Sequence, residues 1–193
     1  MARPSVKAER TEEILIAFER CVARFGVEGT SLERIAEESG LRRSLLRYYI
    51  GNRDELVEAL ADRFIDKTTV VMEALYDSLP EEKTAEAMVY ALFAPYDRSD
   101  SAVLVAEALI AAADQYPAVQ DKLSSWYERF LDRVCDLIHS DYPDVNRDRC
   151  WTVAVGIVSI YFNADSMDTL KLSGRYREAS IQSALLLLNT LKA

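Results

Sequence analysis

Glycine, proline, cysteine and histidine are all scarce in this sequence. Its 193 residues include six glycines, five prolines, three cysteines and one histidine. Turn signals are therefore few and well separated, and no repeat or low-complexity segment is visible. Long apolar runs are missing as well. No stretch reaches the roughly 18 uninterrupted apolar residues of a membrane span, and the first ten residues lack the apolar core of a signal peptide.

The cysteine and histidine content argues against disulfide, metal and catalytic chemistry. Cys21, Cys135 and Cys150 each lie in an apolar helical pattern, so we expect three reduced core thiols in a cytoplasmic protein. Cys135 and His139 are four residues apart and would share a helix face, but no further ligand has matching spacing. Glycine-rich phosphate loops and hydrolase signatures are missing too. We therefore predict no metal site, no cofactor, no catalytic residue and no enzyme.

Acidic charge is unevenly distributed along the chain. The formal net charge is −9, but residues 1–56 contain ten basic and ten acidic side chains, whereas residues 57–193 contain thirteen basic and twenty-two acidic ones. The N-terminal part is therefore neutral overall and still carries an arginine cluster. Charges more than about 10 Å away are screened at ordinary salt, so a local basic patch is sufficient to bind phosphates. The net charge does not exclude DNA as a partner.

The stretch from Gly29 to Leu56 has the pattern of two short helices followed by the start of a longer one. Thr30 is the expected N-cap of the first short helix, and Glu33 would complete a capping box with it. Asn52 and Glu55 would form a second capping box, at the start of the long helix. The spacing of these caps predicts a helix-turn-helix.

The second short helix is expected near residues 42–49 and would bury Leu45 or Leu46 together with Tyr49. Gly40 would end the preceding helix in the left-handed conformation. The side of the second helix that is not buried carries basic and polar side chains. A helix of this kind can lie in a DNA major groove.

These residues also resemble those of TetR-family transcriptional regulators. The motif Thr-Ser-x-x-x-Ile-Ala-x-x-Ser-Gly-Leu at residues 30–41 is followed by Leu46, Tyr49 and the run Asn-Arg-Asp-Glu-Leu at 52–56. The resemblance covers roughly residues 10–60. Arg47 stands where the family commonly has a tyrosine, and Arg53 stands where lysine is usual, so both positions keep the ability to bind phosphate.

Eight residues are the predicted DNA contacts. Side chains at the start of a recognition helix reach base edges, and arginine can pair bidentately with guanine. Hydroxyl groups and backbone amides at helix N-termini can bind phosphate. Helix capping alone, or a solvated basic face, is the alternative role for the same residues. The predicted contacts are Thr30, Ser31, Arg42, Arg43, Ser44, Arg47, Tyr48 and Arg53.

Helical patterns continue through the rest of the chain, and no alternating strand pattern occurs. The other helices are expected at about 7–25, 53–78, 82–94, 101–115, 118–140, 147–170 and 175–191. These elements predict an all-α fold of about nine helices. We expect a three-helix helix-turn-helix DNA-binding domain over residues 1–52 and a C-terminal helical bundle for ligand binding and dimerisation over residues 53–193.

The last two predicted helices are apolar on more than one side. Residues 151–162 are apolar on nearly every face, and Leu186 and Leu187 widen the apolar stripe of the final helix. A helix that is apolar on more than one side must be buried on more than one side. We therefore expect a homodimer through these two helices, packed as a four-helix bundle across a two-fold axis. Gly156 would permit a close helix approach, either in the dimer or within one chain.

The resemblance further implies a small-molecule effector of unknown identity inside the C-terminal bundle. Aromatic and apolar residues at helical spacing can line such a pocket, although the same residues also suit an ordinary core. Glu107 is a lone acid in an apolar segment and would face either a cation or water. The candidate lining residues are Met88, Phe93, Tyr96, Glu107, Trp126, Phe130, Trp151 and Tyr161.

Together these patterns predict a TetR-like transcriptional regulator of the bacterial cytoplasm. We expect a ligand-responsive repressor that binds a palindromic operator in double-stranded DNA as a dimer. Two alternatives remain open: an activator on the same fold, and a helical interaction module without DNA binding. Ligand binding would favour a dimer shape that no longer matches the operator spacing.

Overall fold

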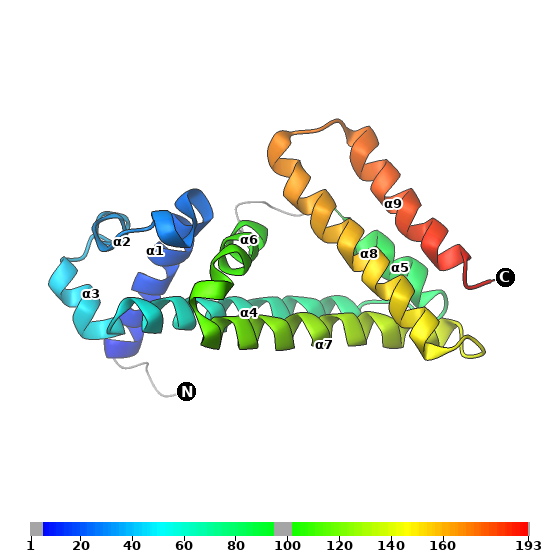
Figure 1. Ribbon diagram of the computed structural model, residues 1–193, viewed down its shortest axis with the longest axis horizontal. Helices are drawn as coiled ribbons and strands as arrows, with labels where there is room; N and C mark the ends of the chain where they lie inside the picture. Colours follow the sequence, from blue (N-terminus) through cyan, green and yellow to red (C-terminus); the bar gives the residue numbers. More distant parts are fainter. Residues whose placement is uncertain (1–5, 95–101, 193) are drawn as a thin grey trace. The chain divides into compact units, whose positions relative to one another are not determined.

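The computed structural model describes residues 6–94 and 102–192, and almost all of them are helical (Figure 1). Within these ranges the chain forms nine α-helices and two short 3₁₀ helices, and no strand occurs there, which confirms the predicted all-α fold. The elements are α1 (Val6–Gly29), α2 (Leu32–Ser39), α3 (Arg43–Ile50), α4 (Arg53–Asp77), α5 (Thr84–Leu92), α6 (Ala102–Ala112), η1 (Ala113–Gln115), α7 (Pro117–Asp141), α8 (Arg147–Met167), η2 (Asp168–Leu170) and α9 (Gly174–Asn189).

The predicted helix ends agree with the structure to within a few residues, because turn residues mark most of them. Pro117 begins α7, where its missing amide costs nothing. Gly26 has φ 71° and ψ 172°, so the regular part of α1 ends there, at the break predicted before the helix-turn-helix. Gly40 ends α2 in the left-handed conformation, as predicted.

The chain forms two compact units, and each is built from two separate stretches of the sequence. The first unit comprises residues 1–69 and 98–124, and the second comprises residues 70–97 and 125–193. Helices α4 and α7 therefore each contribute residues to both units. The first compact unit contains α6 together with the helix-turn-helix. The predicted division into a DNA-binding domain, residues 1–52, and a ligand-binding and dimerisation domain, residues 53–193, concerns function and stays a prediction.

The core of the first unit is built from the apolar stripe of α1. Ile14, Phe18 and Val22 are at most 1% exposed, as their spacing of four residues predicts. Ile35 of α2 and Leu46 of α3 are also buried, and α6 packs against α1. This core fixes the helix-turn-helix on α1.

In the second unit, α9 packs against α8 and α5. Its core includes Ile157 and Val158 of α8 and Ala184 of α9. Gly156 lies against α9 of the same chain: a β-carbon there would come within 2.8 Å of a methyl group of Leu187. The close approach that Gly156 permits is therefore an internal one.

None of the helices in the described ranges combines the length and apolarity needed to cross a membrane. Cys21, Cys135 and Cys150 are free and buried. Burial raises the pKa of each of these thiols, so the reactive thiolate form is disfavoured.

Candidate nucleic-acid interface

The N-cap of α2 is Ser31, and the predicted N-cap at Thr30 is wrong. The Ser31 hydroxyl accepts a hydrogen bond from the Arg34 amide at 3.4 Å. Thr30 is only 1% exposed, and its hydroxyl donates to the Gly26 carbonyl at 2.8 Å. Since Thr30 closes the turn after α1, the helix starts one residue later and the capping box with Glu33 does not form.

Helix α3 presents one buried and one exposed side. Leu46 is 2% exposed, whereas its neighbour Leu45 is 38% exposed, which decides between the two predicted core positions. Tyr48 is 74% exposed and packs edge-to-face on Tyr49, with ring centroids 5.0 Å apart. The exposed side chains of the predicted contact set on or directly before α3 are Arg42, Arg43, Ser44, Arg47 and Tyr48.

An acidic side chain of α2 faces this exposed surface. The carboxylate of Glu33 forms an ion pair with Arg43 at 2.5 Å, and both side chains are about half exposed. The pKa of Glu33 is lowered, first by a hydrogen bond from its own backbone amide and then by the Ser31 hydroxyl and Arg43, while desolvation acts in the opposite direction. Arg42 and Arg47 form no ion pair within the part of the chain that the structure describes, so their charges face solvent.

The second predicted capping box is confirmed at the start of α4. The side-chain oxygen of Asn52 accepts a hydrogen bond from the backbone amide of Glu55 at 2.9 Å, and the Glu55 carboxylate accepts one from the backbone amide of Asn52 at 2.8 Å. This reciprocal pair fixes the junction between α3 and α4.

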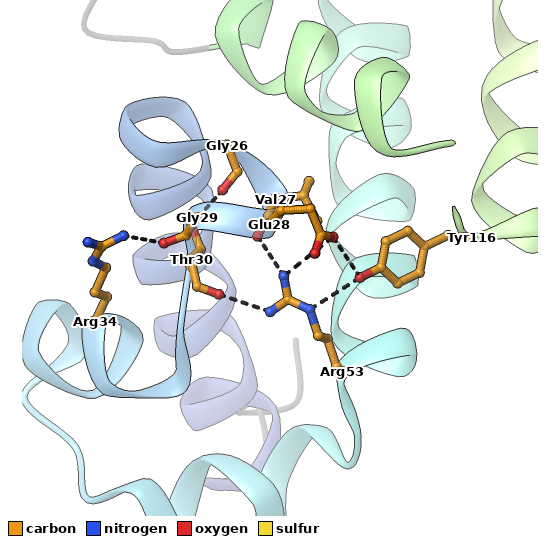
Figure 2. A network of polar contacts seen from close by, with 8 residues as sticks. All are labelled: Gly26, Val27, Glu28, Gly29, Thr30, Arg34, Arg53 and Tyr116. Atoms are coloured by element: carbon orange, nitrogen blue, oxygen red, sulfur yellow. Dashed lines mark hydrogen bonds and ion pairs between the residues drawn. The ribbon is translucent and has the colours of Figure 1, made fainter. Parts of the chain in front are cut away.

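Arg53 is engaged by other residues of the first unit (Figure 2). Its guanidinium donates to the carbonyl oxygens of Thr30 at 2.9 Å and Val27 at 2.6 Å, and to the hydroxyl of Tyr116 at 3.2 Å. Arginine has five N–H groups, so this arrangement leaves donors available. A phosphate contact by Arg53 stays a prediction, with a structural role beside it.

The eight predicted contacts thus differ in accessibility. Thr30 is buried, Arg53 is half-buried, and the other six are exposed around α3 and the start of α2. Sequence reasoning missed Glu33 as an acid beside the arginines and Tyr116 as the partner of Arg53. Only the position of Tyr116 directly before Pro117 hinted at a fixed corner.

The predicted effector residues fall into three groups. Phe93, Phe130 and Met88 are buried in the second unit, while Trp126, Trp151 and Tyr161 are half-buried there. Glu107 is half-buried on α6 and belongs to the first unit. Tyr96 lies outside the described residues.

Phe162, which the sequence analysis left out, lies at the centre of an aromatic cluster in the second unit. Its ring centroid is 5.4 to 6.4 Å from those of four other rings, which belong to Trp126, Tyr127, Phe130 and Tyr161. The rings of Tyr161 and Phe93 are 5.9 Å apart. The structure therefore brings three predicted residues, Trp126, Phe130 and Tyr161, together around one that was missed, and Phe93 joins them through Tyr161.

The described residues contain no group of three or more histidine, cysteine or acidic side chains arranged to hold a metal ion. His139 lies 3.9 Å from the sulfur of Cys150. Its side chain is half-buried.

No family model matches the chain. Over 83 residues the chain is 32% identical to the HTH-type transcriptional regulator PksA of Bacillus subtilis (strain 168), a match that covers 42% of this chain and only 40% of that relative.

Solved structures match over nearly the whole length. A TetR-family transcriptional regulator from Cytophaga hutchinsonii has a TM-score of 0.80 at 16% identity, with 98% of each chain covered. A protein from Saccharomonospora viridis, solved in complex with choline, has a TM-score of 0.79 at 14% identity, with 94% of this chain and 96% of that chain covered. The chain therefore has the same all-α fold as the TetR-family regulator from Cytophaga hutchinsonii, and over 83 residues it is similar in sequence to a helix-turn-helix transcriptional regulator.

Proposed function

We propose that the protein is a sequence-specific DNA-binding transcriptional regulator whose recognition helix is α3. The observation that carries this proposal is the division of α3 into a buried side, at Leu46, and an exposed side that gathers arginines and Tyr48. An exposed helix of this composition suits the major groove, where arginine reads guanine and tyrosine can contact the backbone. The protein would act in the cytoplasm, where operator DNA is accessible.

A homodimer through α8 and α9 completes the proposal. Along α8, Thr152, Val155 and Ser159 form an exposed stripe of small side chains at helical spacing. On α9, Leu186 is 66% exposed, so a large apolar side chain faces away from the core of its own chain. A two-fold pairing of these surfaces would cover the exposed apolar groups and present two copies of α3 to a palindrome.

We place an effector site at the aromatic cluster around Phe162. Aromatic faces attract organic cations, and the structural neighbour from Saccharomonospora viridis contains choline, a quaternary ammonium ion. Choline is therefore the first compound to test, by its effect on the melting temperature of the protein. We expect a concentration-dependent rise, lost in Phe162→Ala; if the wild-type melting temperature does not change, the effector is of another class.

The function is tested by selecting binding sites from random duplex DNA at moderate salt. We expect a palindromic consensus with half-sites about 34 Å, or one helical turn, apart or a multiple of it. A double variant, Arg42→Ala with Arg47→Ala, serves as the control because both side chains are exposed and form no ion pair with any residue that the structure describes. Absence of any enriched sequence with the wild-type protein would contradict the proposal. A reporter fused to the selected site then separates repression from activation.

A further inference from the structure

The guanidinium of Arg53 lies at the C-terminal end of α1, where backbone carbonyl oxygens have no hydrogen-bond partner within the helix. Its two terminal nitrogens donate to Val27 and Thr30 at 2.6 and 2.9 Å. Two other side chains close the same turn: Thr30 donates to the Gly26 carbonyl, and Arg34 donates to the Gly29 carbonyl (Figure 2). The turn that leads into α2 is therefore held by side chains.

Arg53 is also the first residue of α4 and follows α3 after only two residues. The helix-turn-helix comprises residues 31–52, between the turn that Arg53 binds and Arg53 itself. One guanidinium thus joins both ends of the motif. The orientation of this guanidinium relative to the turn therefore determines how α2 and α3 are oriented relative to the rest of the first unit.

Tyr116 holds this guanidinium from the corner between η1 and α7. Its hydroxyl accepts from Nε of Arg53 at 3.2 Å and donates to the carboxylate of Glu28 at 3.2 Å. The corner itself is fixed: Tyr116 precedes Pro117, and its carbonyl accepts from the amides of Val119 and Gln120 at 2.9 and 3.0 Å. The side chain of Tyr116 therefore couples the position of the start of α7 to that of the turn before α2.

We propose that Tyr116 is a positioning residue for DNA binding, which acts through Arg53 and Glu28 on both ends of the helix-turn-helix. The proposal rests on the function proposed above. A displacement of the corner before α7 removes the hydroxyl from Arg53 and loosens the turn, so the orientation of α3 depends on α7. Tyr116 itself does not touch DNA.

The chain offers a matched control in Lys122. This side chain joins the same helix, α7, to α4 through Glu58 at 2.8 Å and Asp62 at 2.7 Å. Among the described residues, its hydrogen bonds and ion pairs go to these two acids of α4 and to no residue of the turn before α2. Lys122→Ala thus removes an α7–α4 contact and leaves the Tyr116 contacts in place.

The first measurement is hydrogen exchange in the free, full-length protein. The Thr30 amide donates to the Val27 carbonyl, the oxygen that Arg53 also binds, so it monitors the turn directly. In Tyr116→Phe we expect its exchange to quicken by about fivefold, the effect of one net hydrogen bond. Lys122→Ala should leave this amide unchanged. If Tyr116→Phe exchanges like the wild type, the inference is wrong whether or not the protein binds DNA.

The second measurement is DNA binding to the selected operator and to versions with altered half-site spacing. Tyr116→Phe should bind about fivefold more weakly and discriminate less between spacings. Its dependence of affinity on salt should match that of the wild type, because no phosphate contact is lost. A steeper or shallower salt dependence, or unchanged affinity and spacing preference, overturns the positioning role. Failure of the wild type to select any sequence instead contradicts the proposed function, and the exchange result then stands alone.

Discussion

Arg47 is the residue of α3 whose contribution can be isolated most directly. Its side chain is exposed and forms no ion pair within the described residues, while the neighbouring Leu46 carries the packing. We expect Arg47→Ala to weaken operator binding by about tenfold, the loss of one arginine contact, and to leave the melting temperature unchanged. A gel-shift titration measures this. Arg129→Ala on α7, which is also exposed, is the control; equal binding by both variants would remove Arg47 from the interface.

Tyr76 of α4 is a buried phenol whose hydroxyl has no hydrogen-bond partner among the described residues. A buried group without a partner costs free energy. Its ring lies under the guanidinium of Arg133, 5.2 Å from the centroid, and phenylalanine would keep this contact. We expect Tyr76→Phe to raise the free energy of unfolding by about 1 kcal/mol. Tyr90→Phe, at a half-exposed tyrosine, should have no such effect.

The same substitution carries a pH signature. Burial raises the pKa of Tyr76 above its ordinary value of 10.0. Above that ordinary value the unfolded chain loses the proton while the folded protein retains it, so stability falls as the pH rises. Urea unfolding at neutral pH and at pH above 10 should show a smaller alkaline loss in Tyr76→Phe than in the wild type. An equal loss would show that the phenol is solvated.

Between α2 and α3, the ion pair of Glu33 with Arg43 would oppose DNA binding at the proposed interface. The carboxylate stands beside side chains that would approach phosphates, and it neutralises an arginine at the start of the recognition helix. We expect Glu33→Gln to strengthen DNA binding by about two- to fivefold, with little change in stability because exposed ion pairs contribute little. Filter binding at several salt concentrations measures this. Glu37→Gln, another exposed acid of α2, is the control, and weaker binding by Glu33→Gln would contradict the idea.

Helices could be predicted from the sequence because their periodicity and their end signals are local. The capping box at Asn52 and the apolar stripe of α1 depend on residues three or four apart, and both are confirmed. The N-cap of α2 was misplaced because the Thr30 hydroxyl has a competing acceptor in the turn behind it. The partners of Arg53 could not be predicted, since Tyr116 is 63 residues away and no periodicity links the two positions.

In the whole molecule, α4 and α7 are the elements that the two compact units share. Within the first unit these two helices are joined by Arg53 with Tyr116 and by Lys122 with two acids. A ligand that alters the second unit could therefore act on DNA binding through α4, through α7 or through the proposed dimer. Its effect is limited by its differential affinity for the two arrangements.

Dimerisation through α9 is tested at Leu186, which is 66% exposed. An arginine there would place a charge in the centre of the proposed interface, where burial without a partner is costly. We expect Leu186→Arg to be monomeric by sedimentation and to bind a single half-site weakly, because the two recognition helices no longer bind one palindrome together. Val70→Arg on α4 is the matched control, since Val70 is 70% exposed and lies outside α8 and α9. A dimeric Leu186→Arg variant with normal operator affinity would move the interface away from α9.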